Sequence, residues 1–268
     1  MQAARAMHGL LRSSTSVRGC NPFTQSPPRW YFGGGSLAER NVSRAEVRRS
    51  SATSDKLQPR AESILKYWLG DVYQSNDRLA FSPEVMKKWF AGGPKVDEEI
   101  LRLFGEDIQK VENGELDDWK EHPYNALASI VIMDQFVRSV YRGTSKMCCM
   151  DDKCFGLAKH MVDSGITKEL KFLERTCVYL PYMHREDLQA QKDCVLLYKD
   201  LLAEVAREST PGSNEPLIGA LGQSVKFAQL HLDVVEKYGR FPHRNILLGR
   251  SNTPQEENDF KEGIIPQF

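Results

Sequence analysis

The stretch from Pro123 to Tyr141 reads PYNALASIVIMDQFVRSVY, and it decides the fold. It starts with a proline, contains no glycine, and is followed closely by Gly143. Proline at the first helical position and glycine after the last are typical helix boundaries. Because apolar residues occupy nearly all sides of this helix, we expect it to be the buried centre around which other helices pack.

Helical spacing continues on both sides of this segment, with few convincing strand patterns. Thr253-Pro254-Gln255-Glu256 carries a capping threonine, a proline at the first helical position and the glutamate of a capping box. Helices joined by short loops pack as antiparallel pairs, so an all-α, single compact domain is predicted over residues 56–268. Further helices are predicted up to Gly114, over about 152–163, from after Thr167 to Pro181, and over about 186–208 and 223–238, with a loop over 211–222.

The first 54 residues differ in composition from the rest of the chain. They hold eight arginines, no lysine, nine serines and only two acids, Glu39 and Glu46. Basic, serine-rich and acid-poor N-termini are typical of organelle transit peptides. We therefore expect residues 1–55 to be a transit peptide and disordered leader that directs the protein to the mitochondrial matrix. A plastid destination, or an N-terminal arm that is never cleaved, are the alternatives.

The rest of the chain excludes several classes of protein. Without the first 54 residues, 28 basic and 34 acidic residues remain, a net charge of about −6 that gives no broad footprint for nucleic acid. No apolar run is long enough to cross a membrane, so a soluble protein is expected. The six cysteines form no CxxC pair, which indicates reduced thiols rather than a disulfide framework.

Polar residues interrupt the apolar pattern in three places. Asp134 and Arg138 lie inside the most hydrophobic helix, four residues apart and hence on one face. A buried carboxylate there must be paired, because burying it alone costs several kcal/mol.

The other two interruptions are rich in histidine, arginine and acids. In the first, His184 is followed by Glu186 and Asp187, either of which is placed to orient its imidazole. The second concentrates guanidinium groups that bind carboxylate or phosphate, together with one histidine and one asparagine. Its residues are Arg240, His243, Arg244, Asn245 and Arg250.

These segments resemble the domain-of-unknown-function 924 family over about residues 62–260. The resemblance implies an all-helical fold similar to a tetratricopeptide-type array, and it implies no activity. Two motifs depart from the family pattern: Val137 and Ser139 replace a proline and an asparagine, and Arg185 replaces a frequent serine. The matching motifs are Ile64 to Gly70, Trp89-Phe90, Asp134-Gln135-Phe136 with Arg138, Arg142-Gly143-Thr144, His184 to Asp187, Gly239 to Asn245, Leu248-Gly249-Arg250 and Thr253-Pro254.

Two functions follow from these residues. In the first, the three segments converge on one pocket that binds or hydrolyses a small anionic metabolite. His184 or His243 would move a proton, and Asp134 or Glu186 would set its tautomer. The ligand-binding residues would be Arg138, Asp187, Arg240, Arg244, Asn245 and Arg250.

The second function is a tetratricopeptide-like adaptor that binds a protein or peptide on a concave face. A buried ion-pair network that only locks the helices is the structural alternative to a ligand site. The spacing of the histidines and acids matches no closed metal-site signature, so neither a metal nor a cofactor is predicted.

Overall fold

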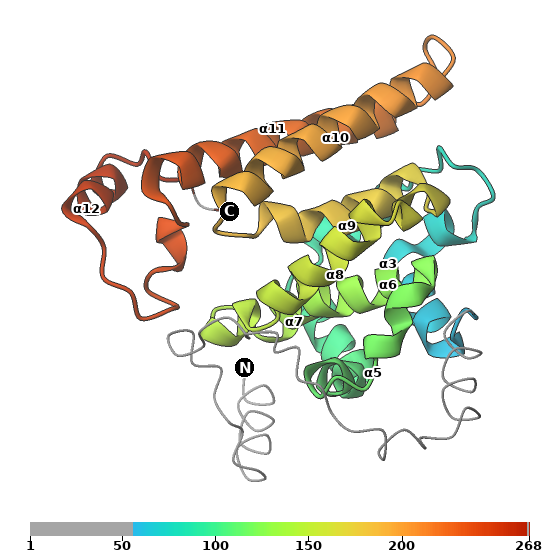
Figure 1. The fold of residues 1–268 in the computed structure, drawn as a ribbon, viewed down its shortest axis with the longest axis horizontal. Helices are drawn as coiled ribbons and strands as arrows, with labels where there is room; N and C mark the ends of the chain where they lie inside the picture. The colour runs from blue at the N-terminus through green and yellow to red at the C-terminus, as the bar shows by residue number, and fades with distance from the viewer. Residues whose placement is uncertain (1–55, 267) are drawn as a thin grey trace, which may run out of the picture. The chain divides into compact units, whose positions relative to one another are not determined.

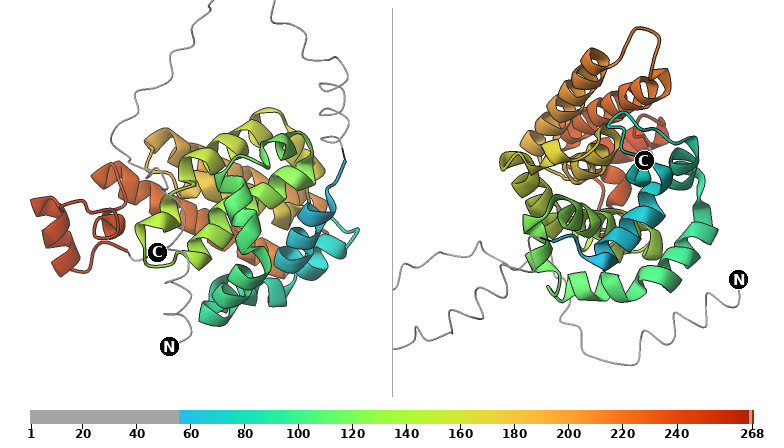
Figure 2. Two further views of the ribbon diagram at one scale, coloured as in Figure 1. Left: turned by 90° about the horizontal axis from the view of Figure 1, so that it is seen from below. Right: turned by 90° about the vertical axis from the view of Figure 1, so that its right-hand side faces the viewer.

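The computed structural model describes residues 56–266 and 268, and every regular element within them is helical. This confirms the predicted all-α class. The predicted leader, residues 1–55, lies outside the described part of the chain. Figures 1 and 2 show the helices from three directions.

The N-terminal helices of the described region are α3 (Pro59–Gln74), α4 (Pro83–Ala91) and α5 (Gly93–Glu112). Ser82 caps α4 by accepting a hydrogen bond from the backbone N–H of Val85. Trp68 and Trp89 stack with ring centroids 5.9 Å apart, which joins α3 to α4.

The predicted central helix is present as one helical run with a defect. It consists of α6 (Pro123–Ile130), a π-helical turn (Val131–Phe136) and α7 (Val137–Val140). Residues 126–132 are almost completely buried, as the apolar sequence predicted. A π turn widens the helix, and such turns are frequent at functional sites. Here it contains Asp134.

The next two helices are α8 (Asp151–Asp163) and α9 (Phe172–Met183). Pro181 was expected to stop the fourth helix, but it lies inside α9. The proline removes one backbone donor near the end of the helix. The helical hydrogen bonds resume directly afterwards, because His184 N–H donates to Leu180 O at 2.9 Å. Burial of Tyr182 and Met183 offsets the missing hydrogen bond.

Helices α10 (Leu188–Glu208) and α11 (Glu215–Tyr238) form a long antiparallel pair, visible at the top of Figure 1. The loop expected over 211–222 was wrong from Glu215 onward, because α11 begins there. Leu217 and Leu221 are fully buried, and this packing overrides the low helix propensity of the glycines around them. Phe227 of α11 is 49% exposed.

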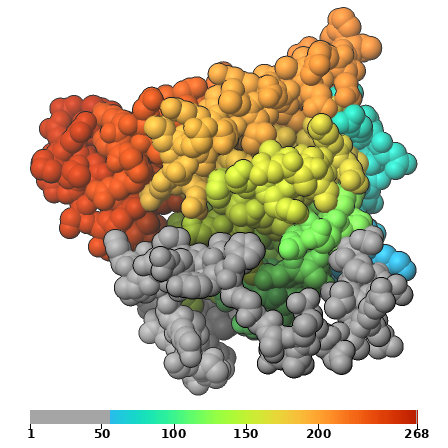
Figure 3. All heavy atoms as spheres, in the orientation of Figure 1, coloured from blue at the N-terminus to red at the C-terminus, as the bar shows by residue number. Residues whose placement is uncertain are grey.

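The C-terminal segment contains a short 3₁₀ turn (Pro242–Arg244) and α12 (Pro254–Lys261). The predicted capping box is present: Thr253 N–H donates to Glu256 at 2.7 Å, and Glu256 N–H donates to Thr253 Oγ1 at 3.2 Å. In the space-filling view this segment, coloured red, lies beside the start of α10 (Figure 3).

The packing confirms a single compact helical domain, whereas tetratricopeptide-like stacking stays a prediction. One hydrophobic core joins residues of α3 through α11. None of the helices in the described region is both long and apolar enough to cross a membrane.

Candidate functional site

The site is built around one buried acid. Asp134 is only 2% exposed, and its carboxylate lies 2.6 Å from Nδ1 of His184 and 3.4 Å from Nε of Arg138. The side-chain amide of Gln135 donates to its second oxygen. Burial alone would raise the pKa of this carboxyl, but His184 and Arg138 together hold the pKa well below its usual range. Asp134 is therefore ionised at neutral pH.

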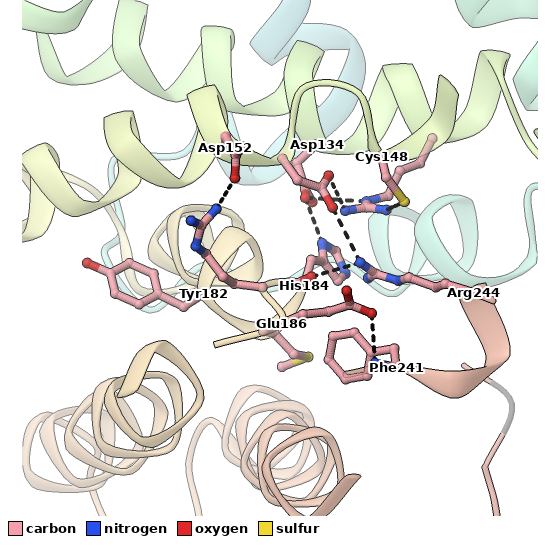
Figure 4. A network of polar contacts seen from close by, with 12 residues as sticks. Asp134, Cys148, Asp152, Tyr182, His184, Glu186, Phe241 and Arg244 are labelled. Atoms are coloured by element: carbon pink, nitrogen blue, oxygen red, sulfur yellow. Dashed lines mark hydrogen bonds and ion pairs between the residues drawn. The ribbon is translucent and has the colours of Figure 1, made fainter. Parts of the chain in front are cut away.

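His184 follows α9 directly and its backbone N–H donates to Leu180 O, so the end of that helix fixes its position. Because the ionised Asp134 can only accept, Nδ1 of His184 donates the hydrogen bond. The other ring nitrogen, Nε2, makes no hydrogen bond to any described residue, and 19% of the side chain is exposed. Burial lowers the pKa of His184 despite the neighbouring Asp134, so the ring is neutral at pH 7. Figure 4 shows the pair in the middle of its polar network.

Arg138 connects the acid to the start of α8. Its Nη2 lies 2.7 Å from Oδ1 of Asp151, and its Nη1 lies 3.7 Å from Sγ of Cys148. Burial opposes the charge of Arg138, but Asp134 and Asp151 raise its pKa, so the guanidinium stays charged. Arg138 is thus fully paired by two carboxylates.

Arg244 is the second cation of the site and is paired less completely. Its Nη1 donates to the backbone oxygen of His184 at 3.0 Å and lies 3.4 Å from Asp151. Its guanidinium carbon lies 4.6 Å from the centroid of the Phe241 ring. Burial and the nearby Arg138 lower the pKa of Arg244. Its Nε and Nη2 donors have no hydrogen-bond acceptor among the described residues.

Glu186, a predicted orienter of His184, has a different role. It pairs with Arg250 at 2.6 and 2.9 Å and accepts the backbone N–H of Phe241 at 2.7 Å. Burial raises its pKa, but these hydrogen bonds outweigh it and lower the pKa overall. Glu186 therefore ties the C-terminal segment to the turn that carries His184.

The other predicted ligand residues brace the C-terminal segment or a helix end. Arg240 forms a bidentate pair with Glu256 at 2.8 and 2.7 Å. Asn245 also donates to Glu256, at 3.3 Å. Asp187 caps α10 through the N–H of Ala190 at 2.8 Å. None of these three polar groups reaches His184.

His243 lies among aromatic rings instead of beside the acid. Its ring centroid is 5.6 Å from that of Phe241 and 5.3 Å from that of Phe268. Burial and the charge of Arg244 lower its pKa to about 4, so it is neutral at pH 7. The structure therefore brings together Asp134, Arg138, His184 and Arg244. Glu186 lies beside them (Figure 4) and raises the pKa of Arg244, although its own hydrogen bonds go to Arg250 and Phe241.

Several contributors were missed by the sequence analysis. Asp151 bridges the two arginines, and Gln191 holds the turn by donating to Met183 O at 2.8 Å and Arg185 O at 2.6 Å. Acids at the start of a helix are common caps, so nothing in the sequence distinguished Asp151. Arg185 points away from the site, toward Asp152 of α8.

The two best-defined surface hollows of the described region lie away from the site. Two surface hollows, of about 350 and 590 Å³, are lined by none of the four residues brought together. The side chains of His184 and Asp151 are the most exposed parts of the site, at 19% and 20%. Within residues 56–266 and 268, no three His, Cys, Asp or Glu side chains are grouped as a metal site requires.

Comparison with known proteins agrees with this fold. The sequence model of a family described as "Bacterial protein of unknown function (DUF924)" matches residues 64–263. A solved structure of a protein of unknown function from Agrobacterium tumefaciens, ATU0120, is similar with a TM-score of 0.60 and 28% sequence identity. The match covers 76% of this chain and 97% of that one. No curated protein matches. The chain belongs to the DUF924 family.

Proposed function

We propose that Asp134, Arg138, His184 and Arg244 form a binding site for a small anionic metabolite. The observation that carries the proposal is the contact of Arg244 with the backbone oxygen of His184 at 3.0 Å, while Nε2 of His184 and the Nε and Nη2 donors of Arg244 have no hydrogen-bond partner among the described residues. Both groups belong to side chains whose remaining polar atoms are already engaged. A ligand that contacts both therefore meets fixed partners.

Charge favours an anion over a neutral ligand. Arg138 and Arg244 share Asp151, which lies 3.4 Å from Arg244, and burial together with the charge of Arg138 lowers the pKa of Arg244. A ligand carboxylate or phosphate beside Arg244 accepts charge-assisted hydrogen bonds from its Nε and Nη2.

The neutral His184 adds the capacity to move a proton. Its Nε2 accepts a proton from a bound water while Asp134 stabilises the resulting imidazolium through Nδ1–H. The hydroxide adds to the ester or anhydride centre of the ligand, and the imidazolium returns the proton to the leaving oxygen. Hydrolysis is the least demanding chemistry of this arrangement.

A thermal-shift screen of phosphate monoesters and small carboxylates tests the binding site. At about 100 times Kd a ligand adds about 2.7 kcal/mol of stability, which raises Tm by roughly 5–10 °C. We expect this shift in the wild type and its loss in Arg244→Gln. The matched control is Arg142→Gln, since Arg142 pairs with Asp97 on the surface at 2.9 Å. No shift with any compound, or an equal shift in Arg244→Gln, contradicts the proposal.

The alternative function, a helical adaptor for a protein or peptide, is supported by exposed apolar side chains on α10 and α11. These are Leu188, Leu196, Phe227 and Leu230. A pull-down from organelle extract tests it: a stoichiometric partner lost in Phe227→Ser supports the adaptor, and its absence contradicts it.

For localisation, we propose import into the mitochondrial matrix, with a plastid as the alternative. The arginine-rich and acid-poor composition of the first 54 residues supports the proposal. Residues 1–55 fused to a fluorescent reporter should direct it to mitochondria. A reporter that stays in the cytosol contradicts the proposal.

A further inference from the structure

The smaller of the two surface hollows lies between α5, α6 and α8, and none of its lining residues belongs to the Asp134 site. Its volume is about 350 Å³, which falls in the range of small-molecule pockets. Figure 1 shows α6 and α8 running side by side above α5. The lining residues are Val111, Leu116, Asp117, Lys120, Ser129, Met133, and four residues of α8 that include Gly156 and His160.

Ser129 is the first sign that this hollow has an occupant. It is 3% exposed and lines the hollow, and its Oγ has no hydrogen-bond partner among the described residues. A serine within a helix ordinarily donates to the carbonyl four residues earlier. Ser63 and Ser224 do so here, at 3.0 and 3.2 Å. Leaving a buried hydroxyl unpaired is unfavourable, so the exception calls for a partner.

Gly156 is the second sign, independent of the first. It lies in the middle of α8, where glycine disfavours a helix relative to alanine. A Cβ added at this position would meet no atom within 4 Å, so close packing does not explain the glycine. The missing side chain instead keeps the wall of the hollow open.

The lining also defines the chemistry of an occupant. The buried floor contains Ser129 with apolar Val111 and Met133, whereas the charged residues lie at the exposed rim. The rim holds two lysines against one aspartate. Lys153 contacts Asp117 at 2.7 Å and donates to Val111 O at 2.8 Å. Lys120 has only a long contact with Glu121, at 3.8 Å. Lys120 therefore has donors available for a ligand at the rim.

We propose that this hollow is a binding site for a small organic monocarboxylate with an apolar chain. The carboxylate lies at the rim beside Lys120 and Lys153, and the chain covers Val111 and Met133. The Oγ of Ser129 is closed off in this structure, so its side chain rotates on binding to pair with an oxygen at the far end of the chain. The fitting ligand therefore has a polar group at each end.

Isothermal titration of the full chain with three probes tests each part of this assignment. The probes are terminally hydroxylated hexanoate, hexanoate, which lacks the inner oxygen, and hexanediol, which lacks the charge. The hydroxylated acid should bind in a saturable manner and about threefold to tenfold more tightly than hexanoate, the effect of one hydrogen bond. Ser129→Ala should abolish that difference, whereas Ser224→Ala should preserve it.

Closing the hollow is the second arm of the test. Gly156→Leu should abolish binding, and Gly219→Leu, which adds the same side chain to another helical glycine with no atom near its Cβ, should leave it intact. Arg244→Gln should also bind normally, which separates this site from the proposed anion site. Should Gly156→Leu fail to fold by circular dichroism, the serine and probe comparison decides. No saturable binding of the hydroxylated acid, or undiminished binding in folded Gly156→Leu, overturns the proposal.

Discussion

The carboxylate of Asp134 lies 2.6 Å from Nδ1 of His184, although the two residues are 50 positions apart in the chain. The acid belongs to a π turn in the central helix, and the histidine follows the last residue of α9. The contact thus links the most buried helix to the turn after α9 and leaves Nε2 of His184 without a hydrogen-bond partner among the described residues.

Removing the charge of Asp134 should destabilise the fold strongly. Asp134→Asn leaves Arg138 without one of its two carboxylates, and breaking a buried pair from one side costs about 3–5 kcal/mol. Urea unfolding measures the loss. The control, Asp97→Asn, breaks the pair with exposed Arg142 and should cost less than about 1 kcal/mol. Equal losses in the two variants would show that Asp134 is no more than a surface-type partner.

Stability should fall as the solution is acidified. The pKa values of His184, His231 and His243 are all lowered in the folded protein, to about 3 for His231 and about 4 for His243. Between these values and the unfolded value of about 6.5, the unfolded chain binds more protons. The stabilisation is therefore complete above about pH 6.5 and declines below it, by about 1.4 kcal/mol per pH unit for each histidine.

His231→Phe isolates one of these histidines. His231 stacks on Phe268 with centroids 3.7 Å apart, so phenylalanine preserves the ring packing while removing the proton site. Unfolding free energies measured from about pH 6.5 to 4.5, above the titration of most carboxyls, should show a shallower slope than in the wild type. An unchanged slope would mean that burial of His231 does not contribute to acid sensitivity.

Two glycines should respond oppositely to alanine. Gly156 has ordinary helical geometry and open space around its Cβ, so Gly156→Ala should stabilise the protein by about 1 kcal/mol. Gly239 ends α11 with a φ of 69°, so Gly239→Ala should destabilise it by about 1–2 kcal/mol. Thermal unfolding of both variants provides the comparison. Effects of the same sign would contradict this account of the helix boundaries.

Glu256 should control the order of the last helix. It accepts hydrogen bonds from Arg240, Thr253 N–H and Asn245. Glu256→Gln weakens the charged contacts, each worth about 1.5–3 kcal/mol. Hydrogen exchange should accelerate over residues 253–261, whereas exchange in α9 should remain slow. Uniform acceleration across the chain would instead indicate a global role for this residue.

The sequence predicted the existence of the helices better than their boundaries and irregularities. The apolar run ending at Met133 identified the central helix, because a helix that is apolar on nearly all sides has to be buried. The π turn was not predictable, since it depends on tertiary packing rather than on local propensity. Pro181 and the start of α11 were misjudged for the same reason: buried Tyr182 and Leu217 outweigh local helix breakers.

The site was predictable only in part. Asp134 and Arg138 stood out because charge interrupts an apolar helix, and the structure indeed places both beside His184. The partners of the C-terminal arginines could not be read from spacing. Glu186 forms an ion pair with Arg250, and Glu256 forms one with Arg240. Arg244 is left as the incompletely paired cation.

The tautomer and accessibility of His184 test the central claim most directly. Long-range proton–nitrogen correlation spectra of the histidine rings, recorded at neutral pH, distinguish the two nitrogens. We predict a neutral ring protonated at Nδ1, with an Nε2 resonance that shifts when a compound from the thermal-shift screen binds and does not shift in Arg244→Gln. A ring protonated at Nε2, or an Nε2 resonance insensitive to every stabilising compound, would contradict the account.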